Sequence, residues 1–466
     1  MKALLLLITV LLLAVGILQH LIIRQDRKRR HRMGHDELTG ICNWEHLVQK
    51  AELLNKSDWP RYVIYSDIGG FKLINEVFGR EKGNEILRRQ AELIKRFVRE
   101  GDIYGRSGED HFVVIVEQAH FREEYLEECR REMQKVLDNP AYQVQVYFGI
   151  YKAEHFHEPL ASMCDKASLA IQSIKGDLER FVAYYDDSMM ENAVKSKAVI
   201  DEFDVALENG EFQMYLQPQI MAGSGKLHGA EALVRRIRPD GQVIPPMEFI
   251  PVYEKTGLIY RLDLYIWEQA AKKLSEWKQD GVELNISVNI SPRDFYYVDI
   301  YNTFMNLVGK YEIAPEHLNI EITETAIMSD VPNLRSDLER LQAAGFIVEI
   351  DDFGSGYSSL NTLKDINVDT LKIDMGFLRE SENHEKGRII LNSVVRMAKE
   401  LGMPVITEGV ETREQVHDLT HMGCDTFQGY YFSKPVDVET FERRYLHREG
   451  SVSYTHLRAH ETLSDL

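Results

Sequence analysis

Residues 346–352 read Phe-Ile-Val-Glu-Ile-Asp-Asp, and this stretch decides the fold of the C-terminal half of the chain. Its first five residues predict a short buried strand, and the two acids follow at the carboxyl end of that strand. Similar apolar segments recur on both sides, and amphipathic stretches such as 262–277, 331–343 and 388–401 separate most of them. Eight strands separated mainly by helices are typical of an α/β domain folded as a (β/α)8 barrel, which we expect over residues 210–446. The expected strands are Phe212–Leu216, Ala230–Val234, Leu284–Ile290, Leu318–Ile322, Phe346–Ile350, Thr370–Ile373, Val405–Ile406 and one near Phe427.

Polar side chains lie within or directly after each of these strands from the second onward. Because the carboxyl ends of barrel strands meet at one mouth, these side chains are expected to face a single opening. Any one alone is better interpreted as an ion-paired core residue, but several carboxylates at one opening repel one another unless cations lie between them. Oxygen ligands without Cys or His favour Mg²⁺ or Mn²⁺ over zinc. The set is Glu231, Asn289, Glu321, Asp351, Asp352, Lys372, Glu408 and Gln428.

Length and composition limit the rest of the chain. At 466 residues it is too long for one ordinary core, since single cores stop growing near about 250–300 residues, and two domains are expected. The formal net charge of −19 argues against sequence-independent binding to DNA or RNA polymers, which requires a basic surface. The four cysteines lack the paired spacing of a zinc site or a disulfide framework, which fits a reducing cytoplasm.

The amino terminus predicts a membrane anchor. Residues 1–23 are almost entirely apolar and long enough to span a hydrocarbon core of about 30 Å. The competing interpretation, a cleaved signal peptide, would need a shorter apolar region and a small-residue cleavage site. Residues 24–35 carry six arginines or lysines, against only Lys2 ahead of the span. This bias predicts a single-pass signal anchor with all later residues in the cytoplasm, and it leaves open a second role of the basic segment in holding anionic headgroups.

Residues 36–187 predict a separate α/β sheet domain, and residues 188–209 predict a helical connector to the barrel. Three motifs of the first domain together resemble the GGDEF family of diguanylate cyclases, and the resemblance implies a cyclase-like sheet domain. These motifs are Asp36-Glu37-Leu38-Thr39-Gly40, Phe71-Lys72 with Asn75, and Arg106-Ser107-Gly108-Glu109-Asp110-His111-Phe112.

The signature of that family is eroded in this chain. The resemblance implies a Gly-Gly-Asp/Glu-Glu-Phe hairpin, whereas residues 108–112 read Gly-Glu-Asp-His-Phe. Glu109 puts a side chain and a negative charge where the triphosphate would lie, and His111 replaces a carboxylate that Mg²⁺ prefers. Gly69 and Asn84 also stand where the family has aspartate. We therefore expect a degenerate domain that regulates or dimerises. The family positions that remain are Asp67, Asn75 and Asp110.

Arg99 and Asp102 match the RxxD product-binding site of the same family. Because an arginine fork suits phosphate or guanine, the pair is a candidate regulatory c-di-GMP site. An ordinary surface ion pair is the alternative. Binding of GTP without turnover is a further regulatory mode in the family, although Glu109 and Asn84 oppose it.

The barrel half resembles the EAL family of c-di-GMP phosphodiesterases, whose domain is a TIM-like barrel, through seven ordered motifs over some 240 residues. They are Glu231-Ala232-Leu233-Val234-Arg235, Asn289-Ile290-Ser291, Glu321-Ile322-Thr323-Glu324, the loop Asp351–Leu360, Lys372-Ile373-Asp374, Glu408-Gly409-Val410-Glu411 and Gln428-Gly429-Tyr430.

The resemblance implies a pair of Mg²⁺ or Mn²⁺ ions and a role for each matching residue. A first ion would be held by Glu231, Asn289, Glu321 and Asp351. Asp351 would bridge to a second ion held by Asp352 and, through water, by Glu408. Two such ions activate a shared water for in-line attack on phosphorus, and the expected product is linear pGpG. The other implied roles are Lys372 to orient or deprotonate that water, Gln428 to position the same region, and Gln217 and Arg235 to contact the dinucleotide.

Two further positions follow from the same resemblance. Glu324 would anchor the Asp351–Leu360 loop and would not bind metal, and Gly354 and Gly356 would let that loop move. Arg236 stands where the family commonly has tryptophan, which puts pocket packing and guanine contacts in doubt.

The family also implies partners and a location. We expect c-di-GMP as ligand, a homodimer through the EAL domain, and the bacterial inner (cytoplasmic) membrane as the site of anchoring. Two alternatives to an active phosphodiesterase are a catalytically silent c-di-GMP receptor and a bifunctional cyclase and phosphodiesterase, the second disfavoured by Glu109 and His111.

The end of the chain predicts no function. Within residues 451–466, Val452–Thr462 resembles one reading frame of a transposase adapter used in DNA library preparation. We expect this segment to be a non-native tail, and a short disordered tail is the alternative.

Overall fold

The computed structural model describes residues 34–54, 60–137, 139, 142–154, 157–177, 179–328, 331–354, 368–374 and 384–446. These residues form two compact units that divide between Lys195 and Ser196. The predicted anchor at 1–23, all but the last two residues of the basic segment at 24–35, and the tail at 451–466 lie outside the described residues. Among the described residues, no helix has the length and apolar character needed to cross a membrane.

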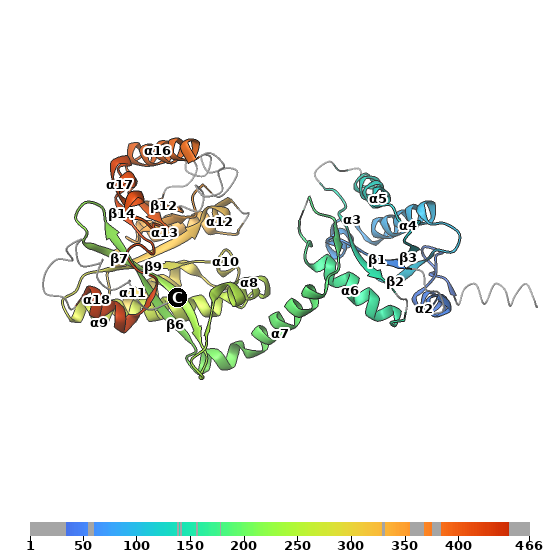
Figure 1. Ribbon diagram of the computed structural model, residues 1–466, viewed down its shortest axis with the longest axis horizontal. Coiled ribbons are helices and arrows are strands. Elements are labelled where there is room, and N and C mark those ends of the chain that lie inside the picture. Colours follow the sequence, from blue (N-terminus) through green and yellow to red (C-terminus); the bar gives the residue numbers. More distant parts are fainter. Residues whose placement is uncertain are drawn as a thin grey trace, which may run out of the picture. The chain divides into compact units, whose positions relative to one another are not determined.

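The first unit is the predicted α/β sheet domain. Its five described strands lie in the order β2-β3-β1-β4-β5, with β1 antiparallel to β3 and β4 (Figure 1). The elements are α2 (Trp44–Leu54), β1 (Arg61–Ile68), α3 (Phe71–Phe78), α4 (Arg80–Phe97), β2 (Ile103–Gly108), β3 (His111–Glu117), α5 (Glu124–Gln134), β4 (Val146–Ala153), α6 (Leu160–Gln172) and β5 (Val182–Tyr184).

Helices cover both faces of this sheet. Ile64 of β1 belongs to an apolar cluster with α4 and α5, whereas its neighbour Val63 belongs to a second cluster with α2 and α6. This division follows from the alternation of strand side chains between the two faces. Gly149 in β4 allows α6 to approach closely, because a Cβ at this position would lie 1.8 Å from the carbonyl oxygen of Ala167.

The second unit contains a closed barrel of eight described strands, which begins after helix α7 (Asp187–Glu208). The barrel strands, in spatial order, are β6 (Phe212–Met221), β7 (Leu227–Ile237), β9 (Asn285–Asn289), β10 (Leu318–Thr323), β11 (Val348–Asp351), β12 (Thr370–Asp374), β13 (Val405–Glu408) and β14 (Thr426–Phe427). Short strands β8 (Val243–Ile244) and β15 (Val436–Asp437) extend it at β7 and β6.

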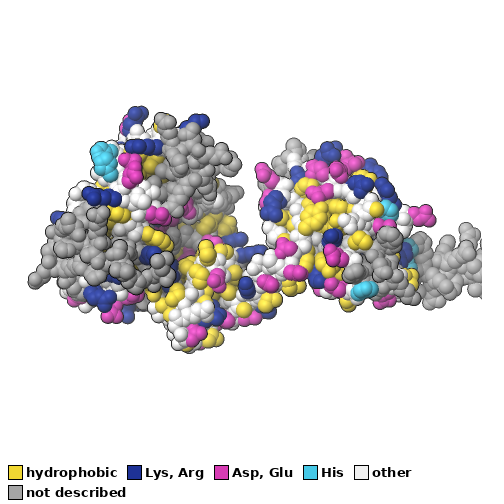
Figure 2. Space-filling view, viewed as in Figure 1, with side chains coloured by type: hydrophobic (Ala, Val, Ile, Leu, Met, Phe, Trp, Pro, Cys, Tyr) yellow, Lys and Arg dark blue, Asp and Glu magenta, His cyan; other side chains and the backbone are white. Residues whose placement is uncertain are grey.

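Helices surround the barrel, and the main ones match the predicted amphipathic stretches (Figure 1). The described helices are α8 (Pro246–Thr256), α9 (Ile259–Gln279), α10 (Asp294–Tyr297), α11 (Ile300–Tyr311), the 3-10 turn η1 (Pro315–His317), α12 (Glu324–Met328), α13 (Leu334–Ala343), α16 (His384–Glu400), α17 (Arg413–Met422) and α18 (Val438–Tyr445). Figure 2 shows acidic and basic side chains interspersed over the visible face of both units.

The first barrel strand departs from the predicted (β/α)8 pattern. β6 runs antiparallel to both of its barrel neighbours, β7 and β14, while the other barrel pairs are parallel. Only residues 222–226 connect β6 to β7. A connection this short makes a hairpin, because a parallel crossover needs a dozen or more residues. The barrel expected from the sequence is therefore present, and its first two strands form a hairpin where a regular (β/α)8 barrel has a helix.

Arg236 lies on the opposite side of β7 from the one considered in the sequence. Its side chain is buried, with Nε 3.0 Å from Glu211 Oε2 and Nη2 2.8 Å from Glu202 Oε2 of helix α7. The arginine therefore joins the barrel to this helix, and pocket packing depends on its neighbour Arg235.

Gly149→Ala should destabilise the first domain, since its methyl group would overlap the backbone of α6. The expected cost is about 1–3 kcal/mol, typical of overpacking. Calorimetry of the full chain should show one unfolding transition at lower temperature and the barrel transition unchanged.

The matched control is Gly309→Ala in α11, where nothing lies within 4 Å of the added methyl group. This change should be neutral or stabilise by up to about 1 kcal/mol, because alanine favours helix. Equal unfolding temperatures for both variants and the parent would contradict the close approach of α6 to β4.

Candidate active site at the mouth of the barrel

The strand register brings the predicted polar residues to one end of the barrel. Glu321 of β10 pairs with Asn289 of β9, and Thr323 of the same strand pairs with Asp351 of β11. Asp374 of β12 pairs with Glu408 of β13. Because these strands are parallel, the side chains at their carboxyl ends surround the same opening.

The ammonium group of Lys372 is the centre of the site. This side chain is fully buried, and its Nζ lies 2.8 Å from Glu321 Oε1 and 2.5 Å from Glu408 Oε1. Glu231 Oε2 and Asp351 Oδ1 each lie 3.6 Å from the same atom. The structure thus gathers four of the predicted carboxylates around one cation.

Hydrogen-bonded amide side chains orient the Glu231 carboxylate. Asn289 Nδ2 donates to Glu231 Oε1 at 3.1 Å, and Gln428 Nε2 donates to Glu231 Oε2. Gln428 also donates to Gln217 at 3.2 Å and accepts from Gln219 at 3.2 Å. Gln217, which the sequence predicted as a substrate contact, is buried and donates to the carbonyl of Ser433. In this structure the amide of Gln217 bonds within the protein.

Burial and mutual repulsion set the charge of the cluster. Burial raises the pKa values of Glu321 and Glu408 well above the usual range, and Glu231 adds repulsion to both. Burial would also raise the pKa of Glu231, but Lys372 and the amides hold it below its usual value. Burial would lower the pKa of Lys372, but the surrounding carboxylates hold it well above the usual value. Lys372 therefore stays charged, but its single positive charge does not balance the four carboxylates around it.

The oxygen atoms of the cluster suit an additional cation. Both carboxylate oxygens of Glu321 and Oε1 of Glu408 are buried, and among the described residues their cationic neighbour is the ammonium group of Lys372. One ammonium group shared by four carboxylates leaves acceptor capacity on these oxygens that an ion would use. Carboxylate and amide oxygens are the ligands that Mg²⁺ and Mn²⁺ prefer. The donor set fits the ions that the sequence predicted.

Asp352 follows the cluster with a left-handed backbone, which few non-glycine residues adopt. Its φ is 55°, and its N–H donates to Asp351 Oδ1 at 2.8 Å. Burial and repulsion by Asp351 raise the pKa of Asp352 to about 6. Left-handed backbone at a non-glycine residue is typical of functional sites. Beside it, Glu324 Oε2 accepts a hydrogen bond from Gly354 N at 3.1 Å, while residues 355–360 of the predicted loop lie outside the described residues.

A cavity of about 440 Å³ lies beside the cluster. Arg235 and Asn289 connect it to the predicted site, and the Trp267 indole in its wall donates to the carbonyl of Asn289 at 2.9 Å. Two acids that the sequence did not single out, Glu254 and Asp263, also line it. Burial and the neighbouring Asp294 raise the pKa of Asp263 well above its usual value.

The sequence analysis did not single out Gln219, Glu349 or Asp263. A sequence pattern could have identified the first two but not the third. Gln219 and Glu349 lie two residues from predicted site positions Gln217 and Asp351, so strand alternation puts them on the same face. Glu349 is buried and accepts from Asn319 at 2.9 Å. Asp263, by contrast, lies on helix α9, where an acid usually marks a solvated face, so no pattern distinguished it.

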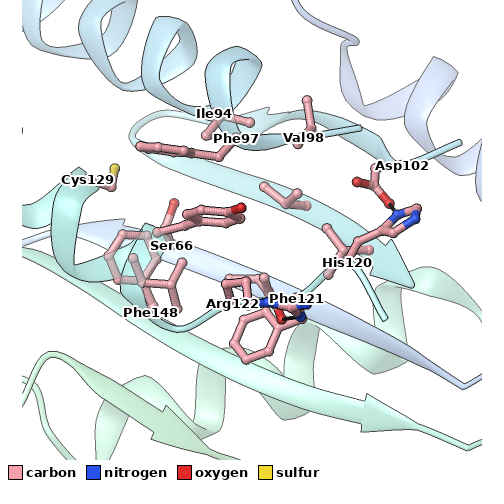
Figure 3. A pocket seen from close by; sticks show the side chains of 15 residues that line it. Ser66, Ile94, Phe97, Val98, Asp102, His120, Phe121, Arg122, Cys129 and Phe148 are labelled. Carbon is pink, nitrogen blue, oxygen red and sulfur yellow. Dashed lines mark hydrogen bonds and ion pairs between the residues drawn. The ribbon is translucent and has the colours of Figure 1, made fainter. Parts of the chain in front are cut away.

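The candidate regulatory pair of the first domain makes local contacts. Asp102 Oδ2 accepts from the backbone N–H of Arg99 at 2.8 Å, and Asp102 Oδ1 lies 3.0 Å from Nδ1 of His120. Figure 3 shows the Asp102 carboxylate turned toward the His120 ring at the edge of an apolar pocket. The Asp102 side chain is 1% exposed, and its partner in the structure is the His120 ring. In this structure the Asp102 carboxylate is used in a contact within the domain.

Arg106 makes hydrogen bonds that link the signature hairpin at residues 108–112 to Asp36. Arg106 donates to the carbonyl oxygen of Glu109 and to the carboxylate of Asp36. Glu109 has a φ of 38°, in the left-handed region that glycine adopts without strain. At the neighbouring position, His111 Nε2 lies 3.5 Å from Asp67 Oδ2, and this contact raises the pKa of the imidazole.

Comparisons with known proteins cover both units. The family model for the EAL domain matches residues 200–435, and the model for the diguanylate cyclase GGDEF domain matches residues 33–179. Signaling protein YkoW of Bacillus subtilis (strain 168) is 32% identical over 431 residues, which cover 89% of this chain and 53% of YkoW. Cyclic di-GMP phosphodiesterase NbdA of Pseudomonas aeruginosa is 28% identical over 423 residues, which cover 89% of this chain and 54% of NbdA.

A solved structure, the PaMucR phosphodiesterase in complex with c-di-GMP, is 33% identical with a TM-score of 0.50 and covers 52% of this chain and 99% of that one. The chain spans about half the length of the curated relatives YkoW and NbdA. The matched family model covers the whole barrel and the acidic cluster at its mouth. The chain belongs to the EAL-domain family and carries a GGDEF domain ahead of its EAL domain.

Proposed function

We propose that this chain hydrolyses c-di-GMP to linear pGpG in its EAL domain. The observation that carries the proposal is the meeting of Glu231, Glu321, Asp351 and Glu408 within 3.6 Å of Lys372 Nζ. An acidic cluster of this kind binds divalent cations, which are the usual means of activating water against a phosphodiester. The name of NbdA and the c-di-GMP complex of PaMucR support the choice of substrate.

The proposal includes two divalent ions. Glu231, Asn289, Glu321 and Asp351 would hold the first, and Asp351 would bridge to a second held by Asp352 and, through water, by Glu408. When bound, such ions supply an acidified water and neutralise charge on the phosphorus oxygens. The buried carboxylates of Glu321 and Glu408, which share one ammonium group with two further acids, support this assignment.

The remaining residues would orient the reaction. Lys372 lies close enough to the carboxylates to hold or move a proton beside the attacking water. Gln428 and Asn289 fix the rotamer of Glu231. This division assigns positioning to the amides and proton handling to the lysine.

The neighbouring cavity would hold a nucleoside part of the substrate. Arg235 would contact phosphate or guanine with its fork of N–H groups. Guanine presents N–H donors, and the carboxylate of Glu254 in the cavity wall is an acceptor for such donors. The amide chain of Gln217 would act on this region through Gln428.

The GGDEF domain would regulate rather than synthesise c-di-GMP. Glu109 supports this role, since its negative side chain stands at the phosphate-binding turn, and His111 supports it by replacing a magnesium ligand. The predicted membrane anchor in the inner membrane and a homodimer through the EAL domain complete the proposal. Both rest on the sequence and the family.

Glu321→Gln should abolish hydrolysis, because it removes a carboxylate that balances the charge of the ions. A loss of several kcal/mol of transition-state stabilisation corresponds to a rate decrease of about 10²–10⁴-fold. Linear product from c-di-GMP with Mg²⁺ or Mn²⁺ is measured by chromatography, with the exposed Glu339→Gln as matched control. If the parent binds c-di-GMP but forms no product, the chain is a silent receptor.

The same Glu321→Gln protein tests the cyclase alternative, since it cannot degrade what the first domain makes. Incubation with GTP and Mg²⁺ should yield no c-di-GMP, because Glu109 and His111 oppose a magnesium–triphosphate complex. Accumulation of the cyclic product would establish a bifunctional enzyme.

Lys372→Met should destabilise the metal-free EAL domain by about 3–5 kcal/mol, because it leaves buried carboxylates without their cation. Mg²⁺ or Mn²⁺ should recover part of this loss by binding the folded state. Lys310→Met is the control, since its ion pair with Glu268 is exposed to solvent and should contribute little to stability. Equal unfolding temperatures for the two variants would disprove the central role of Lys372.

A further inference from the structure

Two histidines lie one turn apart on the exposed face of helix α17. His417 and His421 are separated by four residues, so their side chains leave the same face of the helix. Their ring centroids lie 4.2 Å apart, and the His417 side chain is 69% exposed. Histidine side chains gather on the surface of the second unit in Figure 2, where Figure 1 places α17. The proposed active site uses neither residue.

The contacts of the two rings orient the same nitrogen of each toward solvent. Nδ1 of His421 lies 2.8 Å from the carbonyl oxygen of His417. Because a carbonyl oxygen only accepts, Nδ1 carries the proton, and the lone pair of the neutral ring lies on Nε2. Nδ1 of His417 lies 3.6 Å from Oδ1 of Asp418, whose Oδ2 lies 3.4 Å from Nη2 of Arg388. Metal-binding histidines commonly direct their second nitrogen to a backbone carbonyl or a carboxylate in this way.

The spacing of the pair suits chelation of one ion. Two nitrogens about 2.1 Å from a metal ion lie about 3.0–3.4 Å apart in neighbouring coordination positions. Rings with centroids 4.2 Å apart reach this separation of their Nε2 atoms by small side-chain rotations. Residues 417–421 read His-Asp-Leu-Thr-His, and two histidines at this spacing on one helix are an established arrangement for binding zinc.

Helix α17 (Arg413–Met422) orders the pair before any ion binds. It begins with a capping box, in which Gln415 N donates to Thr412 Oγ1 at 3.2 Å and Thr412 N donates to Gln415 Oε1 at 2.9 Å. Val416 and Leu419 are buried in the core of the barrel unit. An ion therefore meets two ligands on an ordered backbone, and this lowers the entropy cost of bringing them together.

The nitrogen donors determine the class of ion. Imidazole suits Zn²⁺, Ni²⁺ and Cu²⁺, whereas Mg²⁺ and Mn²⁺ prefer oxygen ligands such as those at the barrel mouth. We propose that His417 and His421 form a site for a divalent transition-metal ion of the Zn²⁺ and Ni²⁺ class on the surface of the EAL domain. Water completes the coordination of the ion. Because the chelate requires the helical backbone, the bound ion stabilises the folded domain.

Ni²⁺ is the probe for this site, and excess Mg²⁺ occupies the oxygen cluster of the barrel during the titration. The full chain is prepared without a polyhistidine tag. Calorimetric titration of the parent should show a Ni²⁺ site that His417→Ala and His421→Ala each remove. Loss of one ligand ends the intramolecular binding of the second, which weakens affinity by about 10²-fold or more. The titration uses no c-di-GMP, so its result does not depend on the proposed hydrolysis.

The matched control combines His417→Ala with Glu414→His, since Glu414 is also exposed on α17. This protein keeps two exposed histidines but places them seven residues, or about 10 Å, apart along the helix, where they cannot bind one ion. All other histidines of the chain are the same in the four proteins. Without metal the four should unfold at the same temperature. Ni²⁺ titrations of the parent that equal those of the spacing control overturn the proposal, and so does a parent that titrates like His421→Ala.

Discussion

The mouth of the barrel depends on one buried ammonium group. Lys372 lies among four carboxylates that come from strands as far apart in the chain as β7 and β13. Burying one such charge without a partner costs several kcal/mol, and burying several of one sign costs more. The lysine lowers this cost without removing it, since the acids outnumber it. The remaining imbalance is the reason that the site favours further cations.

The antiparallel first strand contributes to the same site. The β6–β7 hairpin places Gln217 opposite Glu231, and Gln219 lies two residues further along β6 on the same face. Both glutamines join Gln428 in the amide chain behind Glu231. In an all-parallel barrel a helix would separate the first two strands, and this register would be lost. The departure from the predicted barrel thus supplies the groups that hold a key carboxylate in one rotamer.

The strands and their polar ends were predictable because they depend on local pattern. The apolar run at 346–350 followed by Asp351 indicates a buried strand with a functional end, whatever its neighbours are. The direction of β6 depends on loop length, which periodicity does not report. Asp263 lines the cavity because α9 packs against β9. This packing is a tertiary contact, which the local sequence pattern does not predict. The partners of Arg236 could not be predicted for a similar reason, since adjacent strand residues face opposite sides and one of its partners, Glu202, lies on α7.

The two domains meet the same electrostatic problem in different ways. In the barrel, Lys372 is fully buried and cannot leave the acids, so any further positive charge has to be added beside it. In the first domain, the side chain of Lys175 is half exposed and Asp67 has His111 as a second basic neighbour. Loss of the glycine at position 109 opposes a nucleotide, but it leaves both aspartates buried in the fold. Asp67 and Asp110 therefore keep their demand for positive charge whatever the neighbouring signature positions are, because both are buried at the end of the sheet where β1 and β3 meet.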